Sequence, residues 1–257
     1  MSLFNVFSAN IRKVAIEMIR YLPNTISLLV SYYAIFLAMF FGLKTIGDPA
    51  TMEANIRFLI VGNAFWFLLI LGISSMGFEI SSEATRGTLE QLYMSPEGSW
   101  RILLARMIGT LLINVAIMTL MVMLSMVTAG QWLRVDLASL VLILLPTLIG
   151  MMGLGYLVAG LTLVYKQVQA LLQILQFVFV GMAFVPLSRA PFLELAPVVK
   201  GIDLTRQLMV QGRPLADITV MDWTSLIASA GFYFTFGLIF FRFCERRAMA
   251  RGLLAHY

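Results

Sequence analysis

Charged residues are scarce in this chain. Only 12% of its 257 residues are Asp, Glu, Lys or Arg, against roughly 25% in an average soluble domain. Apolar residues make up 60% of the sequence, and the mean hydropathy is +0.92. This composition excludes an ordinary soluble enzyme and predicts an all-α, polytopic membrane protein.

Cysteine and histidine are nearly absent, since each occurs once, as Cys244 and His256. One cysteine excludes an internal disulfide, and the two residues together provide no ligand set for a metal site. The net charge is +5, yet no basic patch is interleaved with aromatic residues, which argues against binding to nucleic acid. Basic residues in so apolar a chain are typical of loops kept on the cytoplasmic side of a membrane.

The residues needed for several kinds of chemistry are also missing. No GxxxxGK[ST] phosphate loop occurs, because the Lys44–Thr45 pair follows Leu43 and not glycine. No serine and histidine, and no pair of carboxylates, is placed for hydrolysis inside the membrane. No Asp, Glu, Lys or Arg lies in the middle of an apolar segment, which disfavours a proton-driven carrier. We therefore expect no catalytic residues, and any energy for uphill transport has to come from a partner.

Six apolar windows of about twenty residues are each long enough to cross a hydrocarbon core of ~30 Å. They predict six transmembrane helices in a single membrane domain, residues 1–257. Only two residues, at 166 and 167, separate the fourth window from the fifth. The windows are Pro23–Leu43, Phe58–Phe78, Ile102–Thr128, Leu137–Tyr165, Val168–Leu187 and Trp223–Phe241.

The first 22 residues combine apolar and charged side chains at helical spacing. Phe7, Ile11, Val14, Met18 and Leu22 recur every three or four residues, which predicts an amphipathic helix lying along the membrane interface. A tail with accidental periodicity is the alternative. A secretory signal peptide is not indicated, because charges interrupt the apolar run.

The distribution of Lys and Arg predicts the orientation of the chain. With the N-terminus inside, eleven of these residues fall on the cytoplasmic face and seven on the opposite face. An even number of spans then places both termini in the cytoplasm. Residues 80–98, between the second and third windows, lie on the same face.

This insert, residues 80–98, is charged, although both flanking segments are strongly apolar. Ser81 and Ser82 are candidates for capping a short helix, along which Glu83, Arg86 and Glu90 have the spacing of helical ion pairs. Pro96 ends it. The insert is either a docking element for a partner or a solvated connector with incidental charge pairs.

The run EATRGTLEQLYMSP, residues 83–96, resembles the cytoplasmic loop of ABC-2-type transporter permeases. The six windows, the N-terminal segment and the place of the insert extend this resemblance over most of the chain. It implies a permease subunit of an ATP-driven exporter in the bacterial cytoplasmic (inner) membrane. The insert is then a coupling helix in which Glu83, Arg86, Glu90 and Tyr93 contact the ATPase, and Gly87 permits close approach.

The resemblance also implies partners. Two copies of a nucleotide-binding ATPase subunit carry the ATP and Mg, so no cofactor binds to this chain directly. A second permease copy, in a homodimer or a similar heterodimer, completes the pathway, and membrane lipid surrounds both.

A segment after the fifth window, residues 188–221, is too apolar for a solvated loop and is broken by proline at 191, 197 and 214. It resembles the family's short outer helices that re-enter the membrane before the last span. The alternative is an interfacial loop anchored by apolar side chains. Non-helical backbone can lie inside the membrane only where protein or water satisfies its hydrogen-bonding groups.

Polar and aromatic residues within the windows are candidates for the pathway, although helix packing or lipid contact explains them equally well. Glycines 150, 153, 155 and 160 in the fourth window indicate close helix packing or a hinge. The candidate pathway residues are Tyr33, Phe36, Phe40, Asn63, Trp66, Gln169, Gln173 and Gln176.

The expected cargo is a hydrophobic drug, a lipid or a peptide, because the spans are apolar and rich in methionine. A lipid-linked polysaccharide is the alternative if the aromatic residues face the pathway. Two other classes remain open, a carrier that works without an ATPase and a membrane scaffold that moves nothing.

Overall fold

The computed structural model describes residues 8, 12, 16, 19–89, 93, 98–165 and 168–250. Within these ranges all regular structure is helical and no strand occurs, so the all-α prediction is confirmed. Most residues of the amphipathic helix predicted for residues 1–22 lie outside the described residues, as do residues 90–92 and 94–97 of the insert, including Glu90.

Five helices are long and apolar enough to cross a membrane. A further apolar helix, α7 (Gln169–Phe184), occupies the fifth predicted window but has only 16 residues, or about 24 Å at 1.5 Å per residue. The six-span count is therefore not confirmed and stays a prediction. The five long helices are α2 (Leu22–Ile46), α3 (Met52–Thr85), α5 (Ser99–Ala129), α6 (Leu137–Tyr165) and α9 (Val220–Ala250).

Two helices extend well past the apolar windows that predicted them. The second window ended at Phe78, but α3 continues to Thr85, and α9 continues beyond Phe241 to Ala250. Neither extension contains glycine or proline, and the extension of α9 is rich in good helix formers. Hydropathy therefore located the apolar part of each helix, whereas the charged turns that follow are helical as well.

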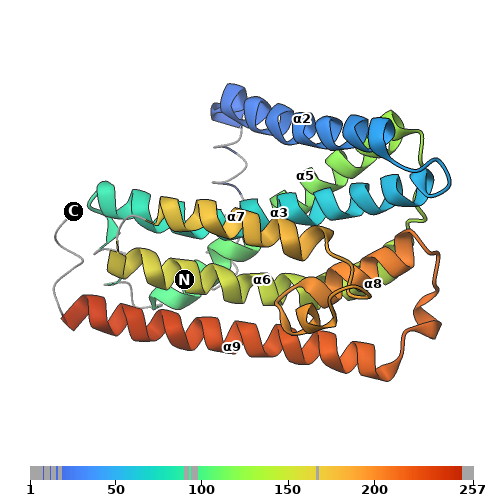
Figure 1. Ribbon diagram of the computed structural model, residues 1–257. Coiled ribbons are helices and arrows are strands. Elements are labelled where there is room, and N and C mark those ends of the chain that lie inside the picture. The colour runs from blue at the N-terminus through green and yellow to red at the C-terminus, as the bar shows by residue number, and fades with distance from the viewer. Residues whose placement is uncertain are drawn as a thin grey trace.

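The core is centred on α3, which contacts α2, α5, α6, α7 and α8. Figure 1 shows α2 along one edge of the bundle and α9 along the other, with α3 and α6 between them. The extent to which each helix is buried agrees with this arrangement. Most of the apolar stretch of α3 is buried, whereas α2 buries only Phe36 and Phe40.

The closest contact between helices joins α6 to α9, which lie side by side in Figure 1. A Cβ added to Gly153 would lie 2.2 Å from the carbonyl oxygen of Tyr233, and one added to Gly237 would lie 2.1 Å from that of Gly153. The backbones therefore touch because both residues are glycine. Close packing by the glycines of the fourth window is confirmed.

The segment between α7 and α9 forms three short helices. They are η1 (Pro191–Leu195), α8 (Val199–Met209) and η2 (Leu215–Asp217). The middle one, α8, packs against α3, α6, α7 and α9, and most of its residues are buried. The broken, apolar character expected of this segment is thus present, and its depth relative to a membrane stays a prediction.

Candidate functional site

The first six residues of the insert, 80–85, are the end of α3 and not the start of a separate helix. Ser81 and Ser82 lie inside α3, and the Ser82 hydroxyl donates to the carbonyl of Glu79. The expected serine cap was therefore wrong. A serine within a helix bonds back to the preceding turn, and no residue before Gly87 breaks the helix.

The helix ends at Gly87 through a Schellman motif. Gly87 has φ +70°, its N–H donates to Ala84 O at 3.1 Å, and the N–H of Thr88 donates to Glu83 O at 3.0 Å. Glycine adopts this left-handed conformation without a Cβ penalty. A Cβ here would meet no atom within 4 Å, so the conformation alone requires glycine within the described chain. The close approach of a partner at Gly87 stays a prediction.

Glu83 faces α5. Its carboxylate lies 2.9 Å from the guanidinium of Arg106, which is also 3.6 Å from the carboxylate of Glu79. The hydroxyl of Thr88 donates a further short hydrogen bond to Glu83. These side chains are between 15% and 23% exposed, so a partly buried ion cluster joins the start of the insert to α5. Sequence spacing paired Glu83 with Arg86 and missed Arg106.

The remaining predicted contact residues lie differently. Arg86, the C-cap of α3, is exposed. Tyr93 is half-buried, and its hydroxyl finds no hydrogen-bond partner within the described ranges. Burial, assisted by the charge of Glu245, raises the pKa of Tyr93, so its phenol is neutral. Tyr93 therefore packs against the bundle, while Arg86 is available to a partner.

The first turn of α5 is also tied to the end of α9. Ser99 donates a short hydrogen bond to Glu245, and the guanidinium of Arg242 lies 4.9 Å from the ring centre of Trp100. On α6, the Tyr156 hydroxyl donates to the carbonyl of Trp100 at 2.8 Å. Sequence reasoning did not find this junction, because its members are distant along the chain. The second end of the insert therefore enters a helix anchored to both α6 and α9.

Two of the four aromatic pathway candidates are buried within the chain, and Tyr33 and Trp66 are half-buried. Phe36 and Phe40 are 0% and 5% exposed, and their rings stack at a centroid distance of 6.0 Å. Tyr33 hydrogen-bonds Thr128 at 2.5 Å, and Trp66 packs edge-on against Tyr32 at 5.9 Å. Phe36 and Phe40 therefore fill the core between helices within one chain, and a role of the four aromatic candidates in a pathway stays a prediction.

The amide candidates fall into two groups. Asn63 is buried on α3, and its side-chain oxygen has no hydrogen-bond partner in the described part of the chain. By contrast, Gln169 and Gln173 are exposed on α7, and Gln176 is half-exposed. The glutamine face of α7 is thus free to meet another subunit or lipid, and its role in a pathway stays a prediction.

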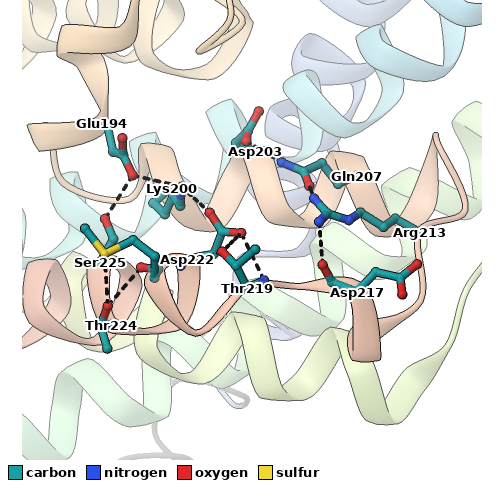
Figure 2. A network of polar contacts seen from close by, with 11 residues as sticks. Glu194, Lys200, Asp203, Gln207, Arg213, Asp217, Thr219, Asp222, Thr224 and Ser225 are labelled. Carbon is teal, nitrogen blue, oxygen red and sulfur yellow. Dashed lines mark hydrogen bonds and ion pairs between the residues drawn. The ribbon is translucent and has the colours of Figure 1, made fainter.

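An ion cluster fastens the outer segment to α9 (Figure 2). The ammonium of Lys200 on α8 lies 2.8 Å from Glu194 in η1 and 2.8 Å from Asp222 in α9. The Lys200 side chain is only 9% exposed. Ser225 donates to Glu194 at 3.1 Å, and the Thr219 hydroxyl donates to Asp222 at 2.7 Å. Three helical segments therefore meet at one buried cation.

A second buried cation, Arg206, holds the other face of α8. Its guanidinium lies 3.6 Å from the ring centre of Phe58 on α3 and donates a short hydrogen bond to the carbonyl of Ala183 on α7. Burial, opposed by the nearby Asp203 carboxylate, lowers the pKa of Arg206 to about 10. Arg206 therefore stays charged near neutral pH and links α8 to α3 and α7.

The Lys200 cluster is expected to hold the outer segment across the neutral range. The hydrogen bond from Lys200 is the largest influence on Glu194 and lowers its pKa below 4.5. Burial favours the neutral amine of Lys200, but hydrogen bonds to Asp222 and Glu194 outweigh it and raise the pKa above 10.5. The stabilisation from Glu194 is lost as pH falls through its lowered pKa, and that from Lys200 as pH rises through its raised pKa.

Hydrogen exchange of residues 199–209 measures this effect. After correction for intrinsic rates, protection is expected to stay constant from about pH 6 to about pH 9. In Lys200→Met the two carboxylates lose their cation, and protection is expected to fall about tenfold or more. If hydrogen exchange of residues 199–209 is the same in Lys200→Met as in wild type, the cluster does not stabilise α8.

Comparison with known proteins identifies the family. Residues 5–239 match the family model described as ABC-2 family transporter protein, and none of the curated proteins compared with the chain matches it. The match covers all five long helices up to the last part of α9. The chain therefore belongs to the ABC-2 transporter family, as a multi-pass membrane permease subunit of an ABC transporter.

Proposed function

We propose that this chain is the permease subunit of an exporter in a bacterial cytoplasmic membrane, with both termini in the cytoplasm. Two copies, or one copy and a similar partner, form the pathway, and two ATPase subunits dock at the insert. Family membership implies the ATPase partner. The observation that carries the role of the insert is its anchoring, because its first end continues α3 and is bonded to Arg106 of α5.

This anchoring suggests how a push on the insert reaches the membrane helices. Movement at Arg86 and Gly87 passes directly along α3, because one uninterrupted helix runs from Met52 to Thr85. The Glu83–Arg106 pair carries the same movement to α5. ATP binding on the partner then biases the permease between inward-closed and outward-open arrangements.

The cargo we propose is a hydrophobic drug, a lipid or a peptide, moved outward. The apolar, methionine-rich helices support it, because flexible thioether side chains adapt to varied apolar ligands. A lipid-linked polysaccharide is the alternative. The burial of Phe36 and Phe40 weakens that alternative, since it depended on aromatic rings facing the pathway. A carrier without an ATPase is the remaining candidate.

The docking role is tested at Arg86, since it is exposed, whereas Glu83 is bound to Arg106. In Arg86→Glu, the ATP hydrolysis that co-purifies with the permease in mild detergent is expected to fall about tenfold, or about 1.4 kcal/mol of docking free energy, because the reversed charge faces a partner surface that suits arginine. The measurement is ATPase activity per mole of purified permease, with wild type alongside.

Arg189→Glu is the matched control, because Arg189 is equally an exposed arginine but lies in the outer segment. It is expected to retain the co-purified activity. Equal losses in both variants would show that the charge change acts through folding or net charge. No ATPase activity with wild type, even from native membranes, favours the ATPase-independent carrier.

A further inference from the structure

An apolar cavity of about 430 Å³ lies within one protomer, between α3, α5, α6 and α8. Val61, Ala64 and Phe65 of α3 form one wall, and Leu140 and Leu144 of α6 form another. Residues of α5 from Met118 to Val127 run along the cavity, which is about 14 Å at 1.5 Å per residue. The cavity thus extends along α5 for about this length.

The cavity walls offer hydrocarbon contacts and no free hydroxyl donor. Both threonines that line it, Thr119 and Thr205, donate to carbonyls of their own helices, those of Val115 and Gly201, at 2.9 and 2.8 Å. Four methionines add flexible apolar surface, and they are Met118, Met123, Met126 and Met209. Such a cavity suits a flexible hydrocarbon and not a polar solute.

The size of the cavity fits one alkyl chain. A dry apolar cavity of roughly 150 Å³ takes a benzene molecule of six carbons, so 430 Å³ corresponds to about 17 carbons on the same scale. Its open side runs along Met123 and Val127 of α5, which are 60% and 64% exposed. A chain can therefore enter sideways from the surrounding lipid.

The mouth of the cavity has the features of a membrane interface. Trp132, which lines it, is 70% exposed, and tryptophan concentrates at the level of lipid headgroups. The neighbouring Arg134 is exposed, and its backbone N–H donates to Met209 of α8 at 3.2 Å. Its guanidinium lies against Gly212, since a Cβ there would be 2.9 Å from it. A fixed loop thus places a cation beside the cavity.

We propose that this cavity binds one acyl chain of an anionic phospholipid, with the lipid phosphate at Arg134. The site lies inside a single protomer and requires neither an ATPase nor a particular cargo. The lipid site is therefore tested independently of the proposed export function, and failure of one proposal does not contradict the other. Bound lipid would fill the space between α3, α5, α6 and α8, and so support the position of α8 against the bundle.

A photoactivatable lipid tests the proposal. The protein is reconstituted in vesicles that contain phosphatidylglycerol carrying a diazirine on one acyl chain, illuminated, and mapped by mass spectrometry. Wild type is expected to carry the label within residues 118–127. Val127→Trp places a large ring at the exposed mouth without altering the buried walls, and is expected to lower this labelling about fivefold or more.

Leu112→Trp is the matched control on the same helix. Leu112 is 50% exposed and lines a second apolar hollow of about 420 Å³ between α5, α6 and α9. Among the described residues, those that line this hollow all belong to these helices and none to a loop. This variant is expected to leave labelling of residues 118–127 unchanged. Equal labelling of residues 118–127 in both variants would show only annular lipid around the protein. No label at these residues in wild type would show that another subunit covers the mouth. Either outcome overturns the proposal.

The headgroup contact has its own test. Arg134→Gln is expected to reduce labelling by the phosphatidylglycerol probe about fivefold. The loss is expected to be smaller with a phosphatidylcholine probe, because its choline cation offsets the phosphate charge. Excess inorganic phosphate in the buffer should not compete, because it has no acyl chain. Equal losses with both probes, or competition by free phosphate, contradict binding of an anionic lipid at Arg134.

Discussion

Gly237→Ala is expected to cause one of the largest losses of stability of any single-methyl addition in the described chain. The new Cβ would lie 2.1 Å from the carbonyl oxygen of Gly153 and 2.9 Å from its Cα. These are backbone atoms that cannot rotate away, so α6 and α9 must separate. We expect a loss of about 3 kcal/mol, the upper end for overpacking a core, measured by unfolding of the purified protein in mixed micelles.

Gly231→Ala is the control, because it adds the same methyl to the same helix. No atom lies within 4 Å of the added Cβ at this position, and alanine favours a helix over glycine by about 1 kcal/mol. This variant should therefore unfold no more readily than wild type. Similar destabilisation of the two variants would mean that an added methyl elsewhere on α9 has the same effect, and that the contact with Gly153 of α6 does not set it.

The contact between α6 and α9 also matters for any conformational cycle. Backbones that touch at Gly153 and Gly237 cannot slide past each other without losing this fit. We therefore expect α6 and α9 to move as one body. The helices joined to the insert, α3 and α5, then either tilt relative to the pair α6 and α9 or move together with that pair.

Hydropathy predicted the apolar segments well and the helix ends poorly. The fourth window, Leu137–Tyr165, coincides with α6, because a left-handed glycine turn at Gly130 and an irregular segment precede it. In α3 and α9 the helix continues through charged turns. Hydropathy indicates where the apolar residues end. The helix itself ends at a residue that leaves helical geometry, such as Gly87.

The charged contacts were harder to predict, because their partners are distant in sequence. Spacing linked Glu83 to Arg86 three residues away, but the structure pairs Glu83 with Arg106 on the next helix. Likewise, Lys200 was expected in an apolar outer segment with no assigned partner, and it meets carboxylates from η1 and α9. Local patterns identify which residues are charged, whereas the packing of helices decides which charges meet.

The role of Gly87 as the end of α3 was not predicted. Glycine following a charged helical run is a recognised end signal, and the sequence contained it. The expectation of a serine cap at Ser81 or Ser82 led instead to a new helix at that point. A continuous helical pattern from Met52, with no breaker before Gly87, could have shown that α3 reaches Thr85.

Arg106→Leu is expected to be nearly as destabilising as the change at Gly237. Arg106 is the cation shared by Glu83 and Glu79, and its side chain is 15% exposed. Its removal leaves two carboxylates close together in a partly buried position. We expect a loss of about 2 to 3 kcal/mol, below the 3 to 5 kcal/mol typical of fully buried pairs. Faster hydrogen exchange of residues 79–88 should accompany it.

A double-mutant cycle separates the ion pair from simple loss of packing. Glu83→Gln keeps a side chain that can accept from Thr88 but removes the charge, so Arg106→Leu should cost less in the Glu83→Gln background than in wild type, by roughly 1 kcal/mol or more. Arg106→Lys keeps the charge and should retain much of the stability. If the cost of Arg106→Leu is the same in both backgrounds, the side chain acts by packing alone. In that case α3, and not the Glu83–Arg106 pair, is the connection between the insert and the membrane helices.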